Sequence, residues 1–339
     1  MTDFHVECVR VGKIDKHPNA DTLGITHVGD YPVIVKLDDF KEGDLAVYVP
    51  VDAIVPNKPE WAFLGGHFRI KAKRLRGVFS QGLLMPAPLG VLEGEDCAVL
   101  LEIEKYETPE EKAERSGGGP NNPRPRAAVP ASLPRYTDLE NVRRWPNALR
   151  EGEDVVITEK IEGENCGVTY ERFPWWKRAW NWFWCEPMGR TIVRSRNQLK
   201  TEGKWVEVTA SIDFEQLPDP ERYSIYGESY GYTAGFNYGK RNIPRFAMFD
   251  AWDRKEKRWC NWQEVAALSS LLDLDLVPIL HWGPWSRDLL NLAEGESEWD
   301  SHVREGFVVR PENERTEPGL GRVILKCKGE GYLLRKEAA

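Results

Sequence analysis

The sequence has few cysteines, and none of them is arranged as a metal site. Its six cysteines are scattered through 339 residues, without a C-x-x-C pair and without a histidine at ligand spacing. Structural zinc sites use such spacing, and small secreted proteins commonly join their cysteines in disulfides. The pattern therefore argues against structural zinc and indicates reduced thiols in a cytoplasmic protein.

Long apolar runs are also lacking. No stretch approaches the ~18–20 consecutive apolar residues that a membrane-spanning helix needs. The first ten residues, MTDFHVECVR, lack the basic region followed by an apolar region that marks a secretory signal peptide. We therefore expect neither secretion nor a membrane partner.

The chain has no excess of positive charge, since 46 Lys and Arg stand against 54 Asp and Glu and give a formal charge of −8. This charge argues against a uniformly cationic coat for nucleic acid. A local basic track is not excluded, because phosphate affinity depends on charges close to the phosphates. Neither a Ser/His/Asp set nor a Rossmann glycine pattern stands out.

Short β-rich segments fill the first hundred residues. Residues 6–14, 26–37, 43–55 and 68–77 are rich in β-branched side chains, with turn residues between them. This spacing predicts a small barrel or sandwich rather than βαβ units. Two stretches, HPNADTL from His17 and RLRGVFSQGL from Arg74, resemble signatures of the tRNA-binding, OB-type modules attached to some aminoacyl-tRNA synthetases.

Five cations lie within eight residues of this region, namely Arg69, Lys71, Lys73, Arg74 and Arg76. Alternation along a strand would put the first three on one face, where they could follow a nucleic-acid backbone. The alternative is a solvated edge strand whose cations prevent aggregation. We expect nucleic-acid contact, because OB modules commonly use such a face.

A change of composition divides the chain. Residues 107–134 are rich in Pro, Gly and charge and nearly free of large apolar side chains, which predicts a flexible linker or long surface loop. The capping-box spacing that starts at Thr137 predicts a short helix through Arg144. We expect an OB-fold nucleic-acid-binding module over 1–106, then the linker, then a second domain over 135–339.

The second domain opens with a strand that ends in a lysine. β-Formers at 155–158 lead to Glu159 and Lys160, which Glu162, Gly163 and Asn165 follow. The pattern Lys160-x-x-Gly163 matches the K-x-x-G of covalent nucleotidyltransferases, in which the amine attacks the α-phosphorus of a nucleotide. Alone it is a weak signal, and on this stretch alone a surface lysine beside a hairpin turn is the favoured explanation.

Further polar segments follow in order, each at the start or end of a strand-like run. They are Arg194-Ser195-Arg196, Gly227-Glu228, Phe246 to Asp250, Glu305-Gly306 and Lys326-x-Lys328. In the last of them the two-residue period of a strand puts both lysines on one face, with Leu325 and Cys327 on the other. Two ammonium groups on one face repel unless an anion lies between them, and a nucleotide phosphate would suit.

Together these segments resemble motifs I, Ia, III, IIIa, IV and V of polynucleotide ligases and mRNA capping enzymes, in the family's order and over roughly residues 136–330. The resemblance implies an α+β protein, with an N-terminal OB-type β-barrel followed by an antiparallel-sheet nucleotidyltransferase domain. The front module, and an end eleven residues after Lys328, resemble one branch of ATP-dependent RNA ligases. Asn165 matches a position that nick-sealing RNA ligases use in the final step.

The resemblance also implies a mechanism and its residues. Lys160 would attack the α-phosphate of ATP to give lysyl-AMP, AMP would pass to a 5′-phosphate, and a neighbouring 3′-OH would displace it. Lys326 and Lys328 would neutralise charge on the α-phosphate. Glu159 and Phe246 would contact adenine, and Gly163 would lie in the nucleotide-binding turn. Arg196 (or Arg194) would bind a phosphate or the ribose. Mg²⁺ (or Mn²⁺) and the ribose would be held by Glu162, Glu228 and Glu305.

The expected partner is RNA, or an RNA-containing duplex with a nick, bound by a monomer. A DNA ligase or a guanylyltransferase is the alternative among enzymes. A non-enzymatic, OB-type RNA-binding protein is the alternative outside them.

One segment departs from the family pattern. Between Tyr170 and Thr191, cations are interleaved with five tryptophans, Trp175, Trp176, Trp180, Trp182 and Trp184. Aromatic rings beside cations can stack bases and hold phosphates. They can also pack against the sheet or the OB module. We expect packing, because large aromatic side chains are most often buried.

Overall fold

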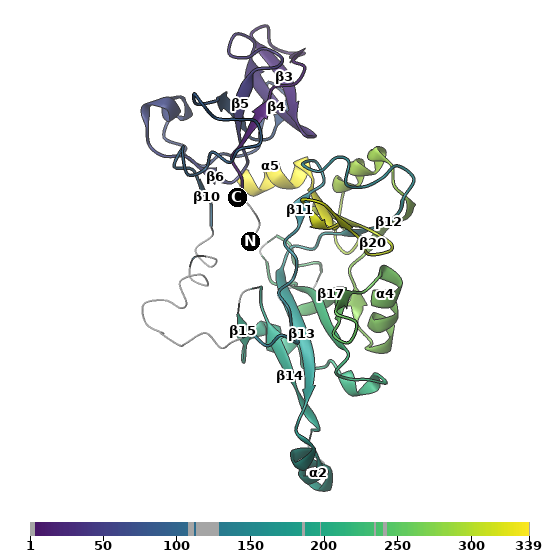
Figure 1. The fold of residues 1–339 in the computed structure, drawn as a ribbon. Coiled ribbons are helices and arrows are strands. Elements are labelled where there is room, and N and C mark those ends of the chain that lie inside the picture. Colours follow the sequence, from purple (N-terminus) through teal and green to yellow (C-terminus); the bar gives the residue numbers. More distant parts are fainter. Residues whose placement is uncertain are drawn as a thin grey trace. The chain divides into compact units, whose positions relative to one another are not determined.

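The computed structural model describes residues 4–107, 112, 129–184, 187–196, 198–233, 235–239 and 243–338. These residues fall into two compact units (Figure 1). Unit 1 lies within residues 1–109, 140–148 and 330–339, and unit 2 lies within residues 110–139 and 149–329. Within the described ranges, no helix combines the length and the apolar character needed to cross a membrane.

Unit 1 is built from short antiparallel strands. The strands are β1 (Glu7–Arg10), β2 (Asp15–Lys16), β3 (Leu23–Val28), β4 (Tyr31–Lys36), β5 (Leu45–Val49), β6 (Ala53–Ile54), β7 (Lys73–Leu75), β8 (Val78–Ser80), β9 (Leu83–Pro86), β10 (Glu104–Lys105) and β11 (Glu140–Asn141). A 3-10 helix, η1 (Pro59–Leu64), and a C-terminal helix, α5 (Glu330–Ala338), complete the unit. The sheets run β1-β5-β9, β2-β3-β4, β7-β8 and β10-β6.

Alternating apolar side chains give unit 1 its core. One buried cluster surrounds Trp61, and a second contains Val33 and the stacked rings of Tyr31 and Tyr48, 5.8 Å apart. The β-rich segment 26–37 contains the end of β3, a turn and β4, which together form a hairpin. It turns at Gly29, whose φ of +54° lies in the left-handed region that glycine adopts most easily.

The two OB-type signatures contact each other. His17 is buried, its Nε2 lies 3.2 Å from the carbonyl oxygen of Leu75, and Asn19 Nδ2 donates to the carbonyl of Arg76 at 2.9 Å. These bonds hold the β7–β8 turn, where Arg76 has a φ of +49°. The first signature therefore supports the turn of the second.

Unit 2 contains longer strands and most of the helices. Its strands are β12 (Asp154–Glu159), β13 (Glu164–Arg172), β14 (Gly189–Arg194), β15 (Leu199–Lys200), β16 (Tyr223–Tyr230), β17 (Arg245–Asp253), β18 (Arg258–Trp259), β19 (Asp275–Leu276), β20 (Ile279–Pro284), β21 (Gly306–Pro311), β22 (Thr316–Glu317), β23 (Gly321–Arg322) and β24 (Leu325–Lys328). Its helices are α2 (Trp175–Trp184), α3 (Lys204–Thr209), α4 (Trp262–Leu271), and the 3-10 helices η2 (Phe214–Gln216) and η3 (Arg287–Ala293).

Two sheets of unit 2 share one core. The larger runs β15-β14-β13-β16-β17-β18, with β19 parallel to β17, and the smaller includes the antiparallel run β24-β21-β12-β20. Val156 of β12, Ile225 of β16 and Val265 of α4 are fully buried members of one cluster. The core therefore ties β12, which leads to Lys160, to the larger sheet.

The predicted helix from Thr137 to Arg144 is wrong. This stretch contains β11 and turns instead. The carboxylate of Asp138, expected in the first helical turn, pairs with Arg196 and, at 3.7 Å, with Arg135. A capping-box pattern is local, and a helix this short depends on tertiary contacts that here favour another conformation.

Most of the predicted linker, residues 108–111 and 113–128, lies outside the described residues. Its last residues are held against unit 2. Leu133 is fully buried and its carbonyl accepts a bond from Arg194 Nη1 at 3.1 Å, while Tyr226 OH donates to the Pro134 carbonyl at 2.5 Å. These residues are therefore not a free loop, and domain boundaries at 106 and 134 stay a prediction.

The tryptophan-rich segment is exposed. It forms α2, at the far end of the hairpin of β13 and β14 (Figure 1). Its five tryptophans are between 58% and 76% exposed. The expectation that they pack is therefore wrong, because the hairpin carries α2 beyond the body of the sheet.

Candidate active site

Three strands of the smaller sheet place Lys160, Glu305 and Lys328 next to one another. Lys160 follows the last residue of β12, and Glu305 precedes the first residue of β21. The strands are antiparallel, and Lys160 N–H donates to the Gly306 carbonyl at 3.0 Å. Lys328, the last residue of β24, lies opposite Gly306.

Glu305 lies between the two lysines. Its Oε2 is 2.8 Å from Lys160 Nζ, and its Oε1 is 3.1 Å from Lys328 Nζ. The Glu305 side chain is only 2% exposed, whereas Lys160 and Lys328 are 24% and 29% exposed. The carboxylate is thus buried beneath two ammonium groups that reach the surface.

Charge and burial oppose each other at these groups. Burial lowers the pKa of Lys160, but Glu305, Glu228 and Glu162 together raise it above its usual value. Burial raises the pKa of Glu305, yet Lys160 and Lys328 bring it down to about 2. The ion pair is therefore fully charged at neutral pH.

The pKa of Glu228 is raised, in contrast to that of Glu305. Burial is the largest influence and raises the pKa of Glu228 to about 8, with Lys160 opposing the shift and Glu305 adding to it. Glu228 lies on β16 directly across from Asn165 on β13. A carboxyl group with this pKa is mostly protonated at neutral pH.

Two glycines are required by close backbone approach. A Cβ at Gly163 would meet the carbonyl oxygen of Ser229, closer than real Cβ atoms come. Gly306 has a φ of +147°, and a Cβ there would meet the carbonyl oxygen of Cys327. Gly163 lies three residues after Lys160 and Gly306 directly follows Glu305, so in both motifs the glycine allows neighbouring backbone to approach closely.

Glu159 is 1% exposed and points into unit 2. Its Oε2 accepts a bond from Glu298 N–H at 2.8 Å and lies 4.0 Å from Arg304 Nε. Its Oε1 is buried and has no hydrogen-bond partner among the described residues. A buried carboxylate oxygen in this state can accept a hydrogen bond from a further donor.

Phe246 lies on β17 opposite Ser229 of β16. It is 6% exposed, and its ring rests on the Cα of Gly227, where a Cβ would collide with it. Gly227 therefore leaves room for the ring, which belongs to the main core cluster.

The arrangement distinguishes Arg194 from Arg196, which the sequence left open. Arg194 is 5% exposed, and its guanidinium donates to the carbonyls of Leu133, Ser195 and Arg196. Arg196 is 43% exposed and pairs with Asp138. Arg194 is thus occupied in holding the backbone, and Arg196 presents its charge at the surface.

The predicted alternation in β24 is observed. Leu325 and Cys327 are fully buried, whereas Lys326 and Lys328 are partly exposed on the other face. Lys326 lies opposite Val308 of β21. Both lysines therefore lie on the same face of the sheet, as the sequence predicted.

The basic residues of unit 1 also alternate as predicted, because Ile70 and Ala72 are buried between them. Not all of them are available to a ligand. Arg69 pairs with Asp52 and lies 3.6 Å from the ring centroid of Tyr106, and Arg74 pairs with Glu330 at 3.1 Å. Lys73 and Arg76 are exposed and Lys71 is partly exposed.

Several residues near Lys160 were not identified as site residues from the sequence. Tyr238 OH accepts a bond from Glu162 N–H at 2.7 Å, and Lys204 pairs with Glu164. Arg304 is 6% exposed and contacts the segment that holds Glu159. Because Arg304 directly precedes Glu305, the sequence could have indicated that it belongs to the site. Nothing in the local sequence marks Tyr238 or Lys204 as site residues.

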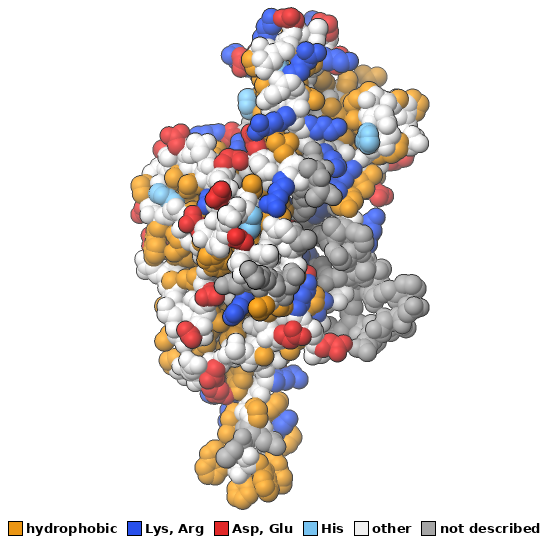
Figure 2. Space-filling view, turned by 180° about the vertical axis from the view of Figure 1, so that it is seen from behind, with side chains coloured by type: hydrophobic (Ala, Val, Ile, Leu, Met, Phe, Trp, Pro, Cys, Tyr) orange, Lys and Arg blue, Asp and Glu red, His pale blue; other side chains and the backbone are white. Residues whose placement is uncertain are grey.

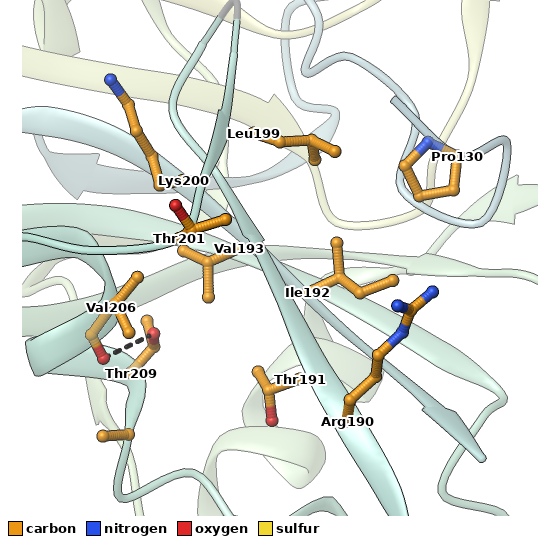
Figure 3. A pocket seen from close by; sticks show the side chains of 11 residues that line it. Pro130, Arg190, Thr191, Ile192, Val193, Leu199, Lys200, Thr201, Val206 and Thr209 are labelled. Atoms are coloured by element: carbon orange, nitrogen blue, oxygen red, sulfur yellow. Dashed lines mark hydrogen bonds between the residues drawn. The ribbon is translucent and has the colours of Figure 1, made fainter. Parts of the chain in front are cut away.

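A separate cavity of about 470 Å³ lies beside β14 and β15 (Figure 3). Pro130, Arg190, Ile192, Lys200 and Val206 are among the residues that line it. It includes none of the predicted site residues. Among the described residues, no three or more His, Cys, Asp or Glu side chains converge as a ready-made metal site.

Comparison with known proteins places this geometry in a family. A family model of RNA ligases matches residues 153–328, and a model of an OB-fold domain matches residues 6–87. These matches confirm the predicted fold class, an OB-type module followed by a nucleotidyltransferase domain. A search of curated proteins gives no match.

Solved structures of the Naegleria gruberi RNA ligase share the fold. A lysine-to-alanine variant with ATP and Mn is 20% identical, with 98% of this chain and 99% of that chain covered and a TM-score of 0.76. The ligase with PPi is 21% identical, with 98% of each chain covered and a TM-score of 0.76. A glutamate-to-alanine variant with AMP and Mn is 20% identical, with 98% and 99% covered and a TM-score of 0.76. Since the RNA ligase model spans more than half of the 339 residues, the chain belongs to the RNA ligase family, a family of enzymes.

Proposed function

We propose that this chain is an ATP-dependent RNA ligase that joins a 5′-phosphate to a 3′-OH, at nicks in a duplex, through a covalent lysyl-AMP. The observation that carries the proposal is the placement of Lys160. It is a partly exposed lysine at a strand end, held by a buried carboxylate that also holds Lys328. An ordinary surface lysine beside a turn does not need this support.

In the first step Lys160 Nζ attacks the α-phosphorus of ATP. A P–N bond forms as the bond to the bridging oxygen breaks, so pyrophosphate leaves and the amine gives up its proton. Because the carboxylates hold the pKa of Lys160 above its usual value, the resting enzyme holds an unreactive ammonium. ATP binding has to weaken the Lys160–Glu305 pair before the amine can react.

Lys326 and Lys328 would stabilise the charge that develops on the α-phosphate. Their shared face and partial exposure support this role. Fixed cations aimed at developing phosphate charge are a principal source of acceleration in phosphoryl transfer. Arg196, rather than Arg194, would contact a phosphate or the ribose.

Glu159 would select ATP over GTP. The unpartnered, buried Oε1 can accept a bond from the 6-amino group of adenine, whereas the 6-oxo group of guanine would face it with another acceptor. Phe246 would stack on the base from its place against Gly227. Solved neighbours with ATP or AMP support an adenine nucleotide.

The carboxylates near Lys160 fit a divalent cation such as Mg²⁺ or Mn²⁺. Mg²⁺ needs only one or two carboxylates beside phosphate oxygens and its own waters, so a ready-made cage is not required. Glu305 already contacts two lysines, which leaves Glu162 and Glu228 as the better ligands. The ion would supply positive charge that neutralises the triphosphate and favours the free amine of Lys160.

Asn165 and the exposed cations of unit 1 would bind the RNA. Asn165 lies on β13 directly opposite Glu228 of β16, and it follows Lys160 by five residues. We expect it to reach a polynucleotide end from this position. We propose a monomer in the cytoplasm. The five described cysteines are buried and are not joined in disulfides, which supports a reducing compartment.

Sealing of a labelled nick tests the proposal. A duplex RNA with one nick and a 5′-³²P at the nick is incubated with enzyme, ATP and Mg²⁺. We expect a longer labelled strand and a transient adenylylated 5′ end, both absent for Lys160→Ala. Sealing of a DNA nick with no sealing of the RNA nick would overturn the assignment of RNA as substrate.

A further inference from the structure

Helix α2 carries its aromatic side chains on one continuous face. At about 100° per residue, an arc of roughly 200° contains only aromatic residues and Ala179. In order around the helix these aromatic residues are Trp182, Trp175, Phe183, Trp176, Trp180 and Trp184. All six are more than half exposed, and they form an apolar patch at the end of unit 2 (Figure 2).

The polar side chains of α2 face the other way. Lys177, Arg178 and Asn181 fill the remaining arc. Asn181 is 3% exposed and its Nδ2 donates to the Pro187 carbonyl at 2.5 Å, so this side is turned to the hairpin. A surface helix normally buries its apolar face, and α2 does the reverse. An exposed apolar patch of this kind marks an interaction surface.

The charged side chains of α2 itself are both positive. They are Lys177 and Arg178, and the helix contains no acidic residue, whereas Arg172 of β13 is paired with Glu215 at 3.7 Å. Trp and Phe on one face with Lys and Arg behind them are typical of helices that lie in the plane of a membrane interface. At about 15 Å the helix is far too short to span a bilayer.

Other occupants fit this face less well. Trp184 contacts the rings of both Phe183 and Trp180, with centroids 5.4 Å and 6.2 Å away, so these rings cover one another instead of standing apart for bases. No cation interrupts the aromatic arc, as phosphate binding beside stacked bases would require. A second copy of the chain would bring the same cations together. An anionic lipid surface suits both the aromatic rings and the charge.

We propose that α2 docks this enzyme on an anionic membrane surface. The aromatic face enters the headgroup region, and Lys177 and Arg178 contact lipid phosphates from the edges of that face. Because α2 lies at the tip of the β13–β14 hairpin, the rings can enter without burying the sheet (Figure 1). The expectation of no membrane partner rested on the lack of a spanning run, which does not bear on binding at a membrane surface. The docking does not depend on the proposed sealing activity.

Vesicle flotation of the full-length protein tests this proposal. Vesicles of phosphatidylcholine alone are compared with vesicles that also contain phosphatidylglycerol. We expect flotation with the anionic vesicles, and its loss in the double variant Trp180→Ser and Trp182→Ser. Trp282→Ser is the matched control, because Trp282 is 47% exposed on β20, outside α2, and its replacement should leave flotation unchanged. Lys177→Glu should weaken partitioning by at least about fivefold.

Three results would overturn the proposal. The first is no flotation of the wild type with anionic vesicles. The second is flotation that survives the double tryptophan variant while its thermal unfolding matches the wild type. The third is binding of α2 to single-stranded RNA or to another protein in place of vesicles, abolished by the same double variant.

Discussion

Lys160 and Glu305 form an ion pair with Nζ and Oε2 2.8 Å apart, and the backbone N–H of Lys160 bonds to the residue that follows Glu305. Backbone and side chain thus join the same two strand ends. Glu305 is almost fully buried and also contacts Lys328. The pair accounts for a lysine that is charged at rest, and in the proposed mechanism ATP binding weakens the pair before the amine attacks.

Replacing Lys328 by alanine should slow formation of enzyme-bound AMP by about 10²–10³-fold, the usual cost of losing one preorganised group that stabilises the transition state. The structure would be little affected, because Glu305 keeps its bond to Lys160. Single-turnover labelling at saturating ATP measures the rate. Lys255→Ala, an exposed lysine of unit 2, is the control, and an equal loss there would argue against a specific role for Lys328.

Glu228 should make the protein less stable as pH rises. Its pKa is about 8 in the folded protein against 4.5 for an ordinary glutamate, so between these values the folded state holds a proton that the unfolded state has lost. Stability therefore falls as pH rises from 4.5 to 8. Glu228→Gln should remove this slope and raise the melting temperature at pH 8 by a few degrees, since about 1 kcal/mol corresponds to roughly 2–4 °C for an unfolding unit of 150–250 residues.

Thermal melts at pH 5, 6.5 and 8 measure this effect. Glu151→Gln, which changes an exposed glutamate, provides the control. If the melting temperatures of Glu228→Gln and the wild type differ by the same amount at all three pH values, the raised pKa of Glu228 is contradicted.

Gly163→Ala should destabilise the protein by about 1–3 kcal/mol, the range for overpacking. The new Cβ would meet the Ser229 carbonyl oxygen and lie 2.9 Å from Glu228 Cγ, so β13 and β16 would have to separate. Denaturant unfolding measures the loss. In Gly12→Ala the nearest atoms are 3.9 Å away, and the substitution should cost little. Equal unfolding midpoints for the two variants would contradict the close approach at Gly163.

The double variant Lys71→Glu and Lys73→Glu should weaken sealing and leave lysyl-AMP formation unchanged. These two side chains point away from the buried Ile70 and Ala72, on the face proposed to follow the RNA backbone. The apparent KM for nicked RNA should rise, and its salt dependence should become shallower, because fewer counterions are released. Lys41→Glu changes an exposed lysine elsewhere in unit 1 and should have little effect. An unchanged KM in the double variant would remove this face from the RNA-binding surface.

Local features of the site could be predicted from the sequence. The shared face of Lys326 and Lys328 follows from the two-residue period of a strand, and the glycine after Lys160 follows from the tight entry into β13. The pairing of Lys160 with Glu305 could be inferred only through the family resemblance, since 145 residues separate them. No local pattern specifies which strands become neighbours.

Other features depended on tertiary contacts that the sequence does not display. Arg194 and Arg196 could not be ranked until Arg194 was found bonded to three backbone carbonyls. The helix predicted at Thr137 failed because Asp138 is used by Arg196. The aromatic residues of α2 are exposed despite the general preference of such side chains for burial. The helix lies at the tip of a hairpin, where no part of the sheet covers it.

Covalent labelling with α-³²P-ATP and Mg²⁺, read on a denaturing gel, tests the central claim most directly. The wild type, freed of pre-bound AMP, should give a labelled band, and Lys160→Ala and Lys160→Arg should give none. Lys160→Arg matters most, because arginine can keep the ion pair to Glu305 but cannot supply a neutral amine. Labelling of the wild type by ATP and not by GTP, together with no label on either Lys160 variant, would support Lys160 as the nucleophile. A labelled band in Lys160→Arg, labelling by GTP instead of ATP, or no label on the wild type would contradict the account.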